Sequence, residues 1–226
     1  PIHNNYIVNA TAYNRNGSSA PITWTWNVLA PSGPPSVSNL VATRGAKWIN
    51  WTWTNPPLTS DFNYTRVSIN SSSNFINDTT NSYFNYSFEP GTSNTIYLQT
   101  VDKSGNMNST IVSNTSATLN TPTGNNVIVN LLNGVIVTFA NVTAEGDTNK
   151  SSISAGNVNN DSLFNVAGNA YDIKTTAIFD NATVEMSHTS SIPTKVKLYH
   201  YENPIWRDVT KDRNSTKVWG VVSSGN

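Results

Sequence analysis

Asparagine is the residue type whose spacing in this sequence most clearly points to chemistry. Fourteen asparagines stand two positions before a Ser or Thr, which makes each a sequon whose amide nitrogen can accept an N-glycan. Random placement of 35 Asn among 27 Ser and 28 Thr would give roughly 8 sequons, so the excess is real but less than twofold. We therefore predict N-glycosylation. The candidate acceptors are Asn9, Asn16, Asn50, Asn63, Asn70, Asn77, Asn85, Asn108, Asn114, Asn141, Asn149, Asn160, Asn181 and Asn214.

Tryptophan is the second candidate for a functional role, because its ring can cover the apolar face of a sugar. The sequence holds seven, and most are expected in hydrophobic cores. Alternation along residues 48–54 puts Trp51 and Trp53 inward and Asn50 outward. Trp48 stands two positions before Asn50 and therefore lies on the same face of the strand. We therefore predict that Trp48 is exposed, and it is the candidate aromatic binding residue.

Catalytic and metal centres have no support in the sequence. The histidines His3, His188 and His200 stand in different segments or strands without ligand spacing. There is no Cys, no G-x-S-x-G elbow and no glycine-rich phosphate loop. We predict no catalytic, cofactor-binding or metal residue and no enzyme. A hydrolase in the last segment is a third alternative, and it requires His188, His200 and carboxylates to meet in one pocket.

Three groups of oxygen donors leave a calcium ion as an open alternative. They lie at residues 102–106, at Asp147 and at residues 208–212. None approaches the D-x-[DN]-x-[DN]-G pattern of a calcium loop, and turn-forming Asp and Asn explain them more simply. Covalent N-glycans are therefore the only attached groups that we expect.

The charge balance argues against two classes of partner. Thirteen basic and thirteen acidic residues cancel, and charged residues are 12% of the chain against about 25% in typical proteins. No run of Lys or Arg could follow a nucleic-acid backbone or an anionic membrane surface. No apolar run reaches the roughly 18 residues of a membrane span. No signal peptide is visible and the chain starts at Pro1, so we expect a mature or excised piece.

The candidate residues must be positioned by β-strands. Short runs of Val, Ile, Thr and aromatic residues alternate with polar ones, and turn residues interrupt them about every 8–12 positions. Pro-containing joints at residues 30–35 and 120–124 favour extended backbone over sheet pairing. The predicted fold is all-β, a tandem of antiparallel β-sandwich modules. The boundaries are 1–30, 31–121 and 122–226.

The first segment predicts one hairpin. Residues 6–12 and 22–28 read as strands joined by a turn at residues 14–19. This hairpin resembles the last two strands of an immunoglobulin-like or PKD-type module. An isolated hairpin is only marginally stable in water, so it must complete a preceding sandwich, pack on the next module or pair with another subunit.

The middle segment carries the most specific motifs. Residues 49–57 read as a strand followed by Asn-Pro-Pro, residues 88–92 read F-E-P-G-T, and residues 101–106 read V-D-K-S-G-N. This segment resembles a fibronectin type III module of the kind repeated in surface proteins of methanogenic archaea. The tyrosine that closes the corner in that family is replaced by Asn94, so the corner is expected to lack a buried ring and its hydroxyl bond.

The last segment predicts a second sandwich. Two hydrophobic runs are joined by Asn133-Gly134, the strongest short hairpin signal. The motifs Y-D-I-x-T-T-A-x-F, L-Y-H-Y and W-x-D-V-T resemble a C-terminal β-module of large bacterial and archaeal surface proteins, which continues past Val222 with another strand. The predicted strands are 127–132, 135–139, 170–179, 195–201, 206–210 and 218–222.

These resemblances and the sequons predict a structural role outside the cell. We expect an N-glycosylated segment of a surface layer, sheath or filament, whose partners are copies of itself or other surface proteins. Exposed strand edges at both ends would allow self-assembly. The alternative is an accessory carbohydrate- or protein-binding (adhesion) module of a large secreted protein, binding polysaccharide through Trp48.

Overall fold

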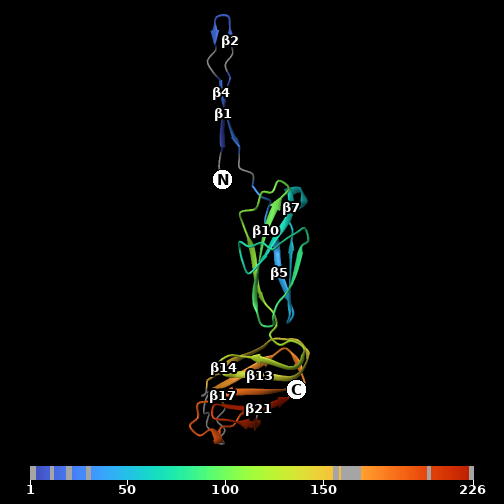
Figure 1. The fold of residues 1–226 in the computed structure, drawn as a ribbon, viewed down its shortest axis with the longest axis vertical. Helices are drawn as coiled ribbons and strands as arrows, with labels where there is room; N and C mark the ends of the chain where they lie inside the picture. The colour runs from blue at the N-terminus through green and yellow to red at the C-terminus, as the bar shows by residue number, and fades with distance from the viewer. Residues whose placement is uncertain are drawn as a thin grey trace. The chain divides into compact units, whose positions relative to one another are not determined.

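Antiparallel strands make up nearly all of the regular structure (Figure 1). The computed structural model describes residues 4–10, 13–18, 22–28, 32–154, 158, 169–202 and 205–223. Among these residues the helical elements are the short 3-10 turns η1 (Leu58–Ser60) and η3 (Pro193–Lys195). The predicted all-β fold of tandem antiparallel sandwiches is confirmed.

The chain divides into two compact units that each combine several segments. The first contains Pro1–Leu40, Trp53–Ser82 and Ile96–Ser113. The second contains Val41–Thr52, Tyr83–Thr95 and Asn114–Asn226. The module boundaries predicted from the Pro-containing joints stay a prediction.

The first unit begins with a long hairpin. Strands β1 (Asn4–Ala10) and β4 (Ile22–Val28) pair antiparallel along their whole length, and the tip pairs β2 (Tyr13–Asn14) with β3 (Gly17–Ser18). The hairpin predicted from the sequence is confirmed (Figure 1). In the described part of the chain, β1 and β4 have no strand neighbour other than each other.

Strands β7 and β8 and most of β10 lie in the first unit and belong to a four-stranded sheet with the order β11-β10-β7-β8. Alternation along β7 buries Thr65 and Val67 completely, and Ile96 on the facing strand is equally buried. The sheet therefore has one apolar face, as a sandwich requires. Its strands are β7 (Phe62–Ile69), β8 (Asn77–Thr79), β10 (Ser93–Asp102) and β11 (Val112–Ala117).

A three-stranded sheet, β5-β6-β9, carries the candidate tryptophan. Ile49, Trp51 and Trp53 are 0%, 0% and 5% exposed, which confirms the alternation predicted for this strand. Trp51 packs edge-on against the Phe88 ring, with 6.0 Å between centroids. The strands are β5 (Ser38–Arg44), β6 (Trp48–Thr54) and β9 (Tyr83–Ser87).

The corner that lacks a tyrosine is closed by polar groups. The Asn94 side chain is buried and its Nδ2 donates to the carbonyl oxygen and the hydroxyl of Thr92, at 3.3 and 3.1 Å. The Thr118 hydroxyl accepts from the Thr92 N–H at 3.0 Å and donates to the Glu89 carbonyl at 2.8 Å. Local hydrogen bonds thus close this corner without a tyrosine hydroxyl.

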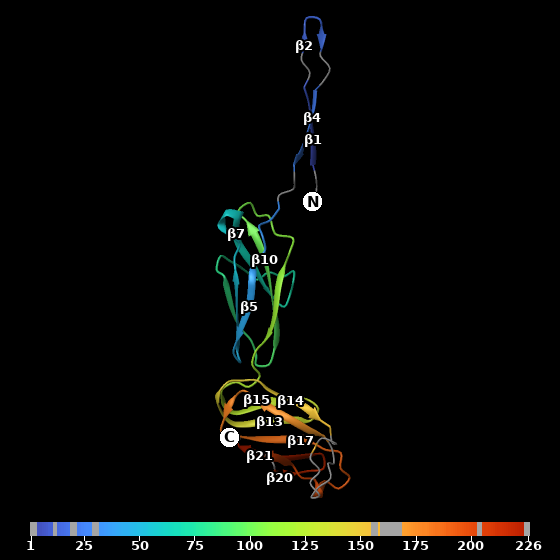
Figure 2. The same cartoon turned by 180° about the vertical axis from the view of Figure 1, so that it is seen from behind.

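The largest sheet lies in residues 124–223 and has the order β12-β13-β17-β21-β20, with β16 pairing β13 (Figure 2). Phe139 and Phe179 meet in its core with 4.9 Å between ring centroids, and Ile173 and Leu198 pack on the same cluster. The strands are β12 (Gly124–Asn130), β13 (Val135–Ala144), β16 (Ile178–Phe179), β17 (Asn181–Ser187), β20 (Thr210–Arg213) and β21 (Lys217–Ser223).

Two smaller ladders complete this region. One pairs β14 (Thr148–Ile153) with β15 (Ala170–Thr175), and the other pairs β18 (Tyr199–Glu202) with β19 (Ile205–Asp208). The strand predicted for residues 170–179 is therefore wrong as one element. The chain leaves β15 at Thr176 and joins another sheet as β16, and the Asp147 N–H bonds the Thr176 hydroxyl at that point.

The Asn133-Gly134 hairpin is confirmed, with one difference in its turn. The Val135 N–H donates to the Leu132 carbonyl at 3.1 Å, as a two-residue turn requires. Leu132 also has a positive φ of 64°, and its side chain is 70% exposed. A leucine at this φ is strained, because its Cβ crowds the backbone.

Two stretches of backbone that the sequence suggested would be unpaired are paired in the structure. Thr121, in the second Pro-containing joint, forms an isolated bridge with Gly146, and each donates its N–H to the other's carbonyl at 3.0 Å. The last strand, β21, is paired with β17 on one side and β20 on the other, so it presents no open edge.

Candidate glycan-binding face

The outer face of the β6–β9 ladder brings the two kinds of candidate residue together. β6 and β9 pair antiparallel with Asn50 directly opposite Asn85 and with Thr52 opposite Tyr83. Because side chains alternate across a strand, these four residues and Trp48 share the face opposite to the buried one. We call Trp48, Asn50, Tyr83 and Asn85 the outer aromatic face.

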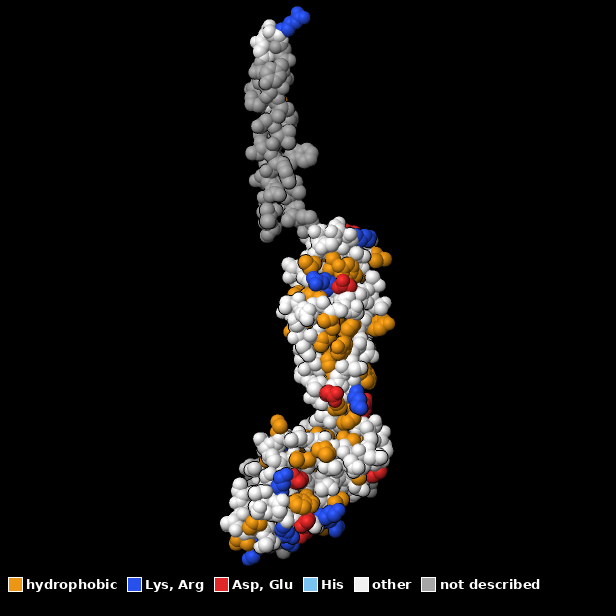
Figure 3. Space-filling view, viewed as in Figure 1, with side chains coloured by type: hydrophobic (Ala, Val, Ile, Leu, Met, Phe, Trp, Pro, Cys, Tyr) orange, Lys and Arg blue, Asp and Glu red, His pale blue; other side chains and the backbone are white. Residues whose placement is uncertain are grey.

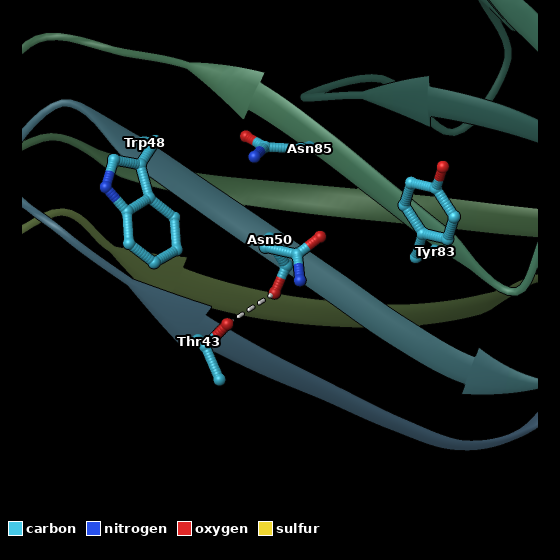
Figure 4. A pocket seen from close by; sticks show the side chains of 5 residues that line it. All are labelled: Thr43, Trp48, Asn50, Tyr83 and Asn85. Atoms are coloured by element: carbon cyan, nitrogen blue, oxygen red, sulfur yellow. Dashed lines mark hydrogen bonds between the residues drawn. The ribbon is translucent and has the colours of Figure 1, made fainter.

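The outer aromatic face forms a shallow, open depression of about 440 Å³. The Trp48 side chain is 38% exposed and Tyr83 is 55% exposed. Figure 4 shows the two rings on either side of Asn50 and Asn85. Two rings flanking polar amides can cover the apolar face of a sugar while the amides bond its hydroxyls.

The neighbouring strand β5 forms a hydrogen bond to the floor of this depression. The Thr43 hydroxyl of β5 donates to the Asn50 carbonyl at 3.4 Å (Figure 4). The lining residues are one Trp, one Tyr, one Thr and two Asn, with no carboxylate or cation among them. The site can therefore form hydrogen bonds and stacking contacts with a neutral ligand.

The other sequons differ in how accessible their amides are. None of the twelve whose side chains are described is buried. Asn50, Asn108, Asn114 and Asn141 are half-buried. Asn9 and Asn160 lie outside the residues whose side chains are described. The exposed acceptors are Asn16, Asn63, Asn70, Asn77, Asn85, Asn149, Asn181 and Asn214.

Among the half-buried sequons, Asn108 has an acceptor nitrogen that is already hydrogen-bonded, and Asn114 has a buried side-chain oxygen. Asn108 Nδ2 donates to the Pro34 carbonyl at 2.7 Å and to the Ser36 hydroxyl at 3.1 Å, so the nitrogen that would carry the sugar is in use. Asn114 Oδ1 is buried and finds no hydrogen-bond partner among the described residues. A glycan on Asn108 would have to displace these two hydrogen bonds.

The oxygen donors considered for calcium accept hydrogen bonds within turns or form ion pairs with basic side chains. Asp102 Oδ1 accepts the N–H groups of Ser104 and Asn106, both at 2.8 Å, and the Asn106 side chain lowers the pKa of Asp102. Asp147 pairs with Arg44 at 2.6 Å. Within the described residues, no three His, Cys, Asp or Glu side chains come together as metal ligands would. A calcium ion stays an untested alternative.

Asp208 belongs to the third group of oxygen donors, and its pKa is the most strongly shifted in that group. The Lys197 amine donates to it at 2.6 Å, and this bond, followed by those from Thr210, lowers the pKa of Asp208 to about 2. The Lys197 pKa is raised by the same hydrogen bond. This pair lies at the surface and has the geometry of a structural ion pair.

The two described histidines have local partners. His188 Nε2 lies 3.2 Å from the Asn214 carbonyl, and His200 Nδ1 lies 3.5 Å from a carboxylate oxygen of Glu202. His3 lies outside the described residues. The pocket of histidines and carboxylates that the hydrolase alternative requires is not formed by the described residues. That the chain is not an enzyme stays a prediction.

Charged side chains are scattered over the visible surface rather than gathered into a patch (Figure 3). The described residues include no helix long and apolar enough to cross a membrane.

Comparison with known proteins gives likeness of fold only. No family model matches, and no curated protein matches either. A two-domain fibronectin type III segment of chicken tenascin aligns over 84% of this chain and 100% of its own, at 10% identity and TM-score 0.36. The chicken CNTN1 FN1–FN3 domains align over 81% and 69%, at 13% identity and TM-score 0.33.

A Clostridium perfringens spore cortex lytic enzyme, SleM, aligns over 46% of this chain at 17% identity and TM-score 0.35. The alignment spans 36% of that enzyme's length. Likeness at these levels assigns no function, so the functional argument depends on the residues of this chain.

The residues of β9 that share a face with Trp48 were not predicted from the sequence. Tyr83 and Asn85 join its face through β9, a strand that no strong apolar run marks. The signal available was the pattern itself, because residues 48–52 read W-I-N-W-T and residues 83–87 read Y-F-N-Y-S.

Proposed function

We propose that this chain is a structural segment of an N-glycosylated extracellular protein, such as a surface layer, sheath or filament. The observation that carries the proposal is the placement of the sequons. Eight of the twelve described acceptors are exposed and none is buried, although these sequons are distributed over β-strands and turns alike. Glycans on such positions would cover a surface with few charges, where amides and hydroxyls supply the polarity.

The test is glycopeptide mass spectrometry on the protein from its native source. We expect occupancy at exposed sequons such as Asn63, Asn149 and Asn181, and none at Asn108 or Asn114. The two half-buried positions are matched controls, because they carry the same motif within the same chain. A chain without glycans at any sequon would overturn the proposal.

Self-assembly through strand edges is supported at one end of the chain. β1 and β4 pair only with each other among the described strands, so each has a free edge that a further strand could extend. Analytical ultracentrifugation across a hundredfold concentration range would test this, with Thr25→Pro in β4 as the edge-blocking variant. A chain that stays monomeric throughout would contradict it.

The second candidate is binding of a neutral polysaccharide by the outer aromatic face. It is favoured by the two exposed rings that flank Asn50 and Asn85. A glycan array probed with unglycosylated chain should give signals that Trp48→Ala abolishes. Tyr201→Ala is the control, because Tyr201 is a similarly exposed ring, 39% accessible, on another ladder. A blank array would contradict this candidate.

A further inference from the structure

The sequons at Asn50 and Asn85 are two copies of one pattern on facing strands. Each has an aromatic residue two positions before the asparagine and a hydroxyl residue two positions after it. Positions two apart on a strand lie on the same face. Each acceptor therefore has a ring on one side and a hydroxyl on the other, all pointing outward from the β6–β9 ladder.

The register makes these two acceptors immediate neighbours. Asn50 and Asn85 are direct partners, and the flanking Phe88 N–H donates to the Lys47 carbonyl at 3.0 Å. Hydrogen-bonded and non-hydrogen-bonded pairs alternate along an antiparallel ladder, which makes Asn50 and Asn85 a non-hydrogen-bonded pair. In such pairs the Cα atoms are only about 4.5 Å apart and the side chains are closest. A sugar ring on one amide then fills the space above the other.

Both aromatic rings are within reach of a sugar on either asparagine. Trp48 precedes Asn50 on its own strand and lies diagonally from Asn85, and Tyr83 has the reverse relation. Diagonal neighbours are about 7–8 Å apart, a distance that aromatic side chains span. In Figure 4 both amides lie between the two rings. The first sugar can therefore pack on Trp48 and Tyr83 whichever asparagine carries it.

We propose that the outer aromatic face carries one glycan, on Asn85 or, when Asn85 is absent, on Asn50, and that its first sugar packs on Trp48 and Tyr83. The inference rests on the proposed N-glycosylation of this chain. Asn85 is preferred because its side chain is exposed, whereas Asn50 is half-buried.

The chemistry is an ordinary glycosyl transfer. The co-reactant is a lipid-linked phosphate or pyrophosphate oligosaccharide, supplied by the glycosylating cell. The C1–O bond to phosphate breaks, the bond from C1 to the asparagine Nδ2 forms, and the lipid phosphate departs while the amide loses one proton to the enzyme's base. After that step the attached sugar covers the second Nδ2 of the pair, which can then no longer react.

Intact-mass spectrometry of the full chain, secreted from a host that attaches a uniform N-glycan, tests the one-glycan rule. The proteins compared are the original chain, Asn50→Gln, Asn85→Gln and the double variant. We expect the first three to carry equal numbers of glycans and the double variant to carry one fewer. An original chain with one glycan more than each single variant would show both sites filled and overturn the rule.

The same series separates this inference from the proposed function. If all four proteins carry equal numbers of glycans while Asn63, Asn149 or Asn181 is occupied, the outer aromatic face carries none and only the inference fails. If no sequon is occupied in native material, the proposed function fails as well.

The packing of the sugar on the rings needs its own measurement. We expect the glycosylated chain to unfold at a higher temperature than the Asn50→Gln/Asn85→Gln variant, and Trp48→Ala/Tyr83→Ala to remove that difference without changing the glycan count. Asn63→Gln is the control sequon, because Asp61 rather than a ring stands two positions before it. A difference that survives loss of both rings would overturn the packing.

Discussion

The two faces of strand β6 contain similar residues and do different work. On the inner face, Ile49 and Trp51 are completely buried, and on the outer face Trp48 stays 38% exposed beside Asn50. Tryptophan therefore has both roles on one strand, in the core at Trp51 and Trp53 and at the surface at Trp48. The difference teaches that the parity of a residue along the strand, and not its type, decides whether it stabilises the fold or is available to a ligand.

The largest expected effect on stability comes from removing a buried ring from the inner face of β6. Trp51→Ala should lower the free energy of unfolding by about 3–5 kcal/mol, because it leaves a cavity in a packed core. Denaturation in urea, followed by circular dichroism, measures it. Trp48→Ala is the matched control and should change stability by less than about 0.5 kcal/mol, as surface substitutions do. Equal losses in the two variants would break the comparison.

A smaller effect should separate two asparagines that share the sequon motif. Asn108→Ala removes a side chain that bonds the Pro34 carbonyl and the Ser36 hydroxyl, and whose oxygen accepts the Thr110 N–H at 2.7 Å. Leaving such partners unsatisfied costs about 1–3 kcal/mol. In unglycosylated protein, Asn85→Ala should be near neutral. The same urea titration decides, and a neutral Asn108→Ala would contradict the structural role assigned to that amide.

The smallest expected effect is a pH dependence that arises away from the neutral outer aromatic face. Because Lys197 lowers the pKa of Asp208 from 3.8 to about 2, this carboxylate contributes stability above about pH 4. The contribution is lost as the pH falls from 4 towards 2. Both side chains are more than a third exposed, so solvent screening keeps the contribution below about 1 kcal/mol.

Asp208→Asn should remove this part of the acid sensitivity, measured as the difference in urea midpoint between pH 5 and pH 2.5. Trp48→Ala should leave the pH dependence unchanged, because no charged side chain lines its face. An unchanged acid response in Asp208→Asn would show that other carboxylates account for it.

Much of the fold could be predicted because alternation is a local property. Strand β6, the Asn133-Gly134 hairpin and the β1–β4 hairpin were all predicted from residue patterns that match the strand period. β17 was missed although Ala182 and Val184 alternate with polar residues along it, because Asn, Thr and Glu dilute the apolar signal. This strand lies inside the largest sheet, so a weak sequence signal can belong to a central element.

The remainder depends on long-range pairing that residue patterns do not encode. The strand-like pattern of residues 170–179 gave no sign that the chain changes sheets after Thr175. The exposure of Trp48 followed from parity, yet its neighbours Tyr83 and Asn85 come from a strand more than thirty residues later in the chain. The candidate site was therefore half predictable, because one strand supplies only half of a face.

The direct pairing of Asn50 with Asn85 also has a consequence for inheritance. When two interchangeable acceptors stand at one place, a codon change that removes either of them leaves the other beneath the same two rings. Selection for a covered face would then act on the pair and tolerate drift at each position. Related chains should accordingly keep at least one of the two sequons together with both aromatic residues, and lose both sequons only where the rings are lost too.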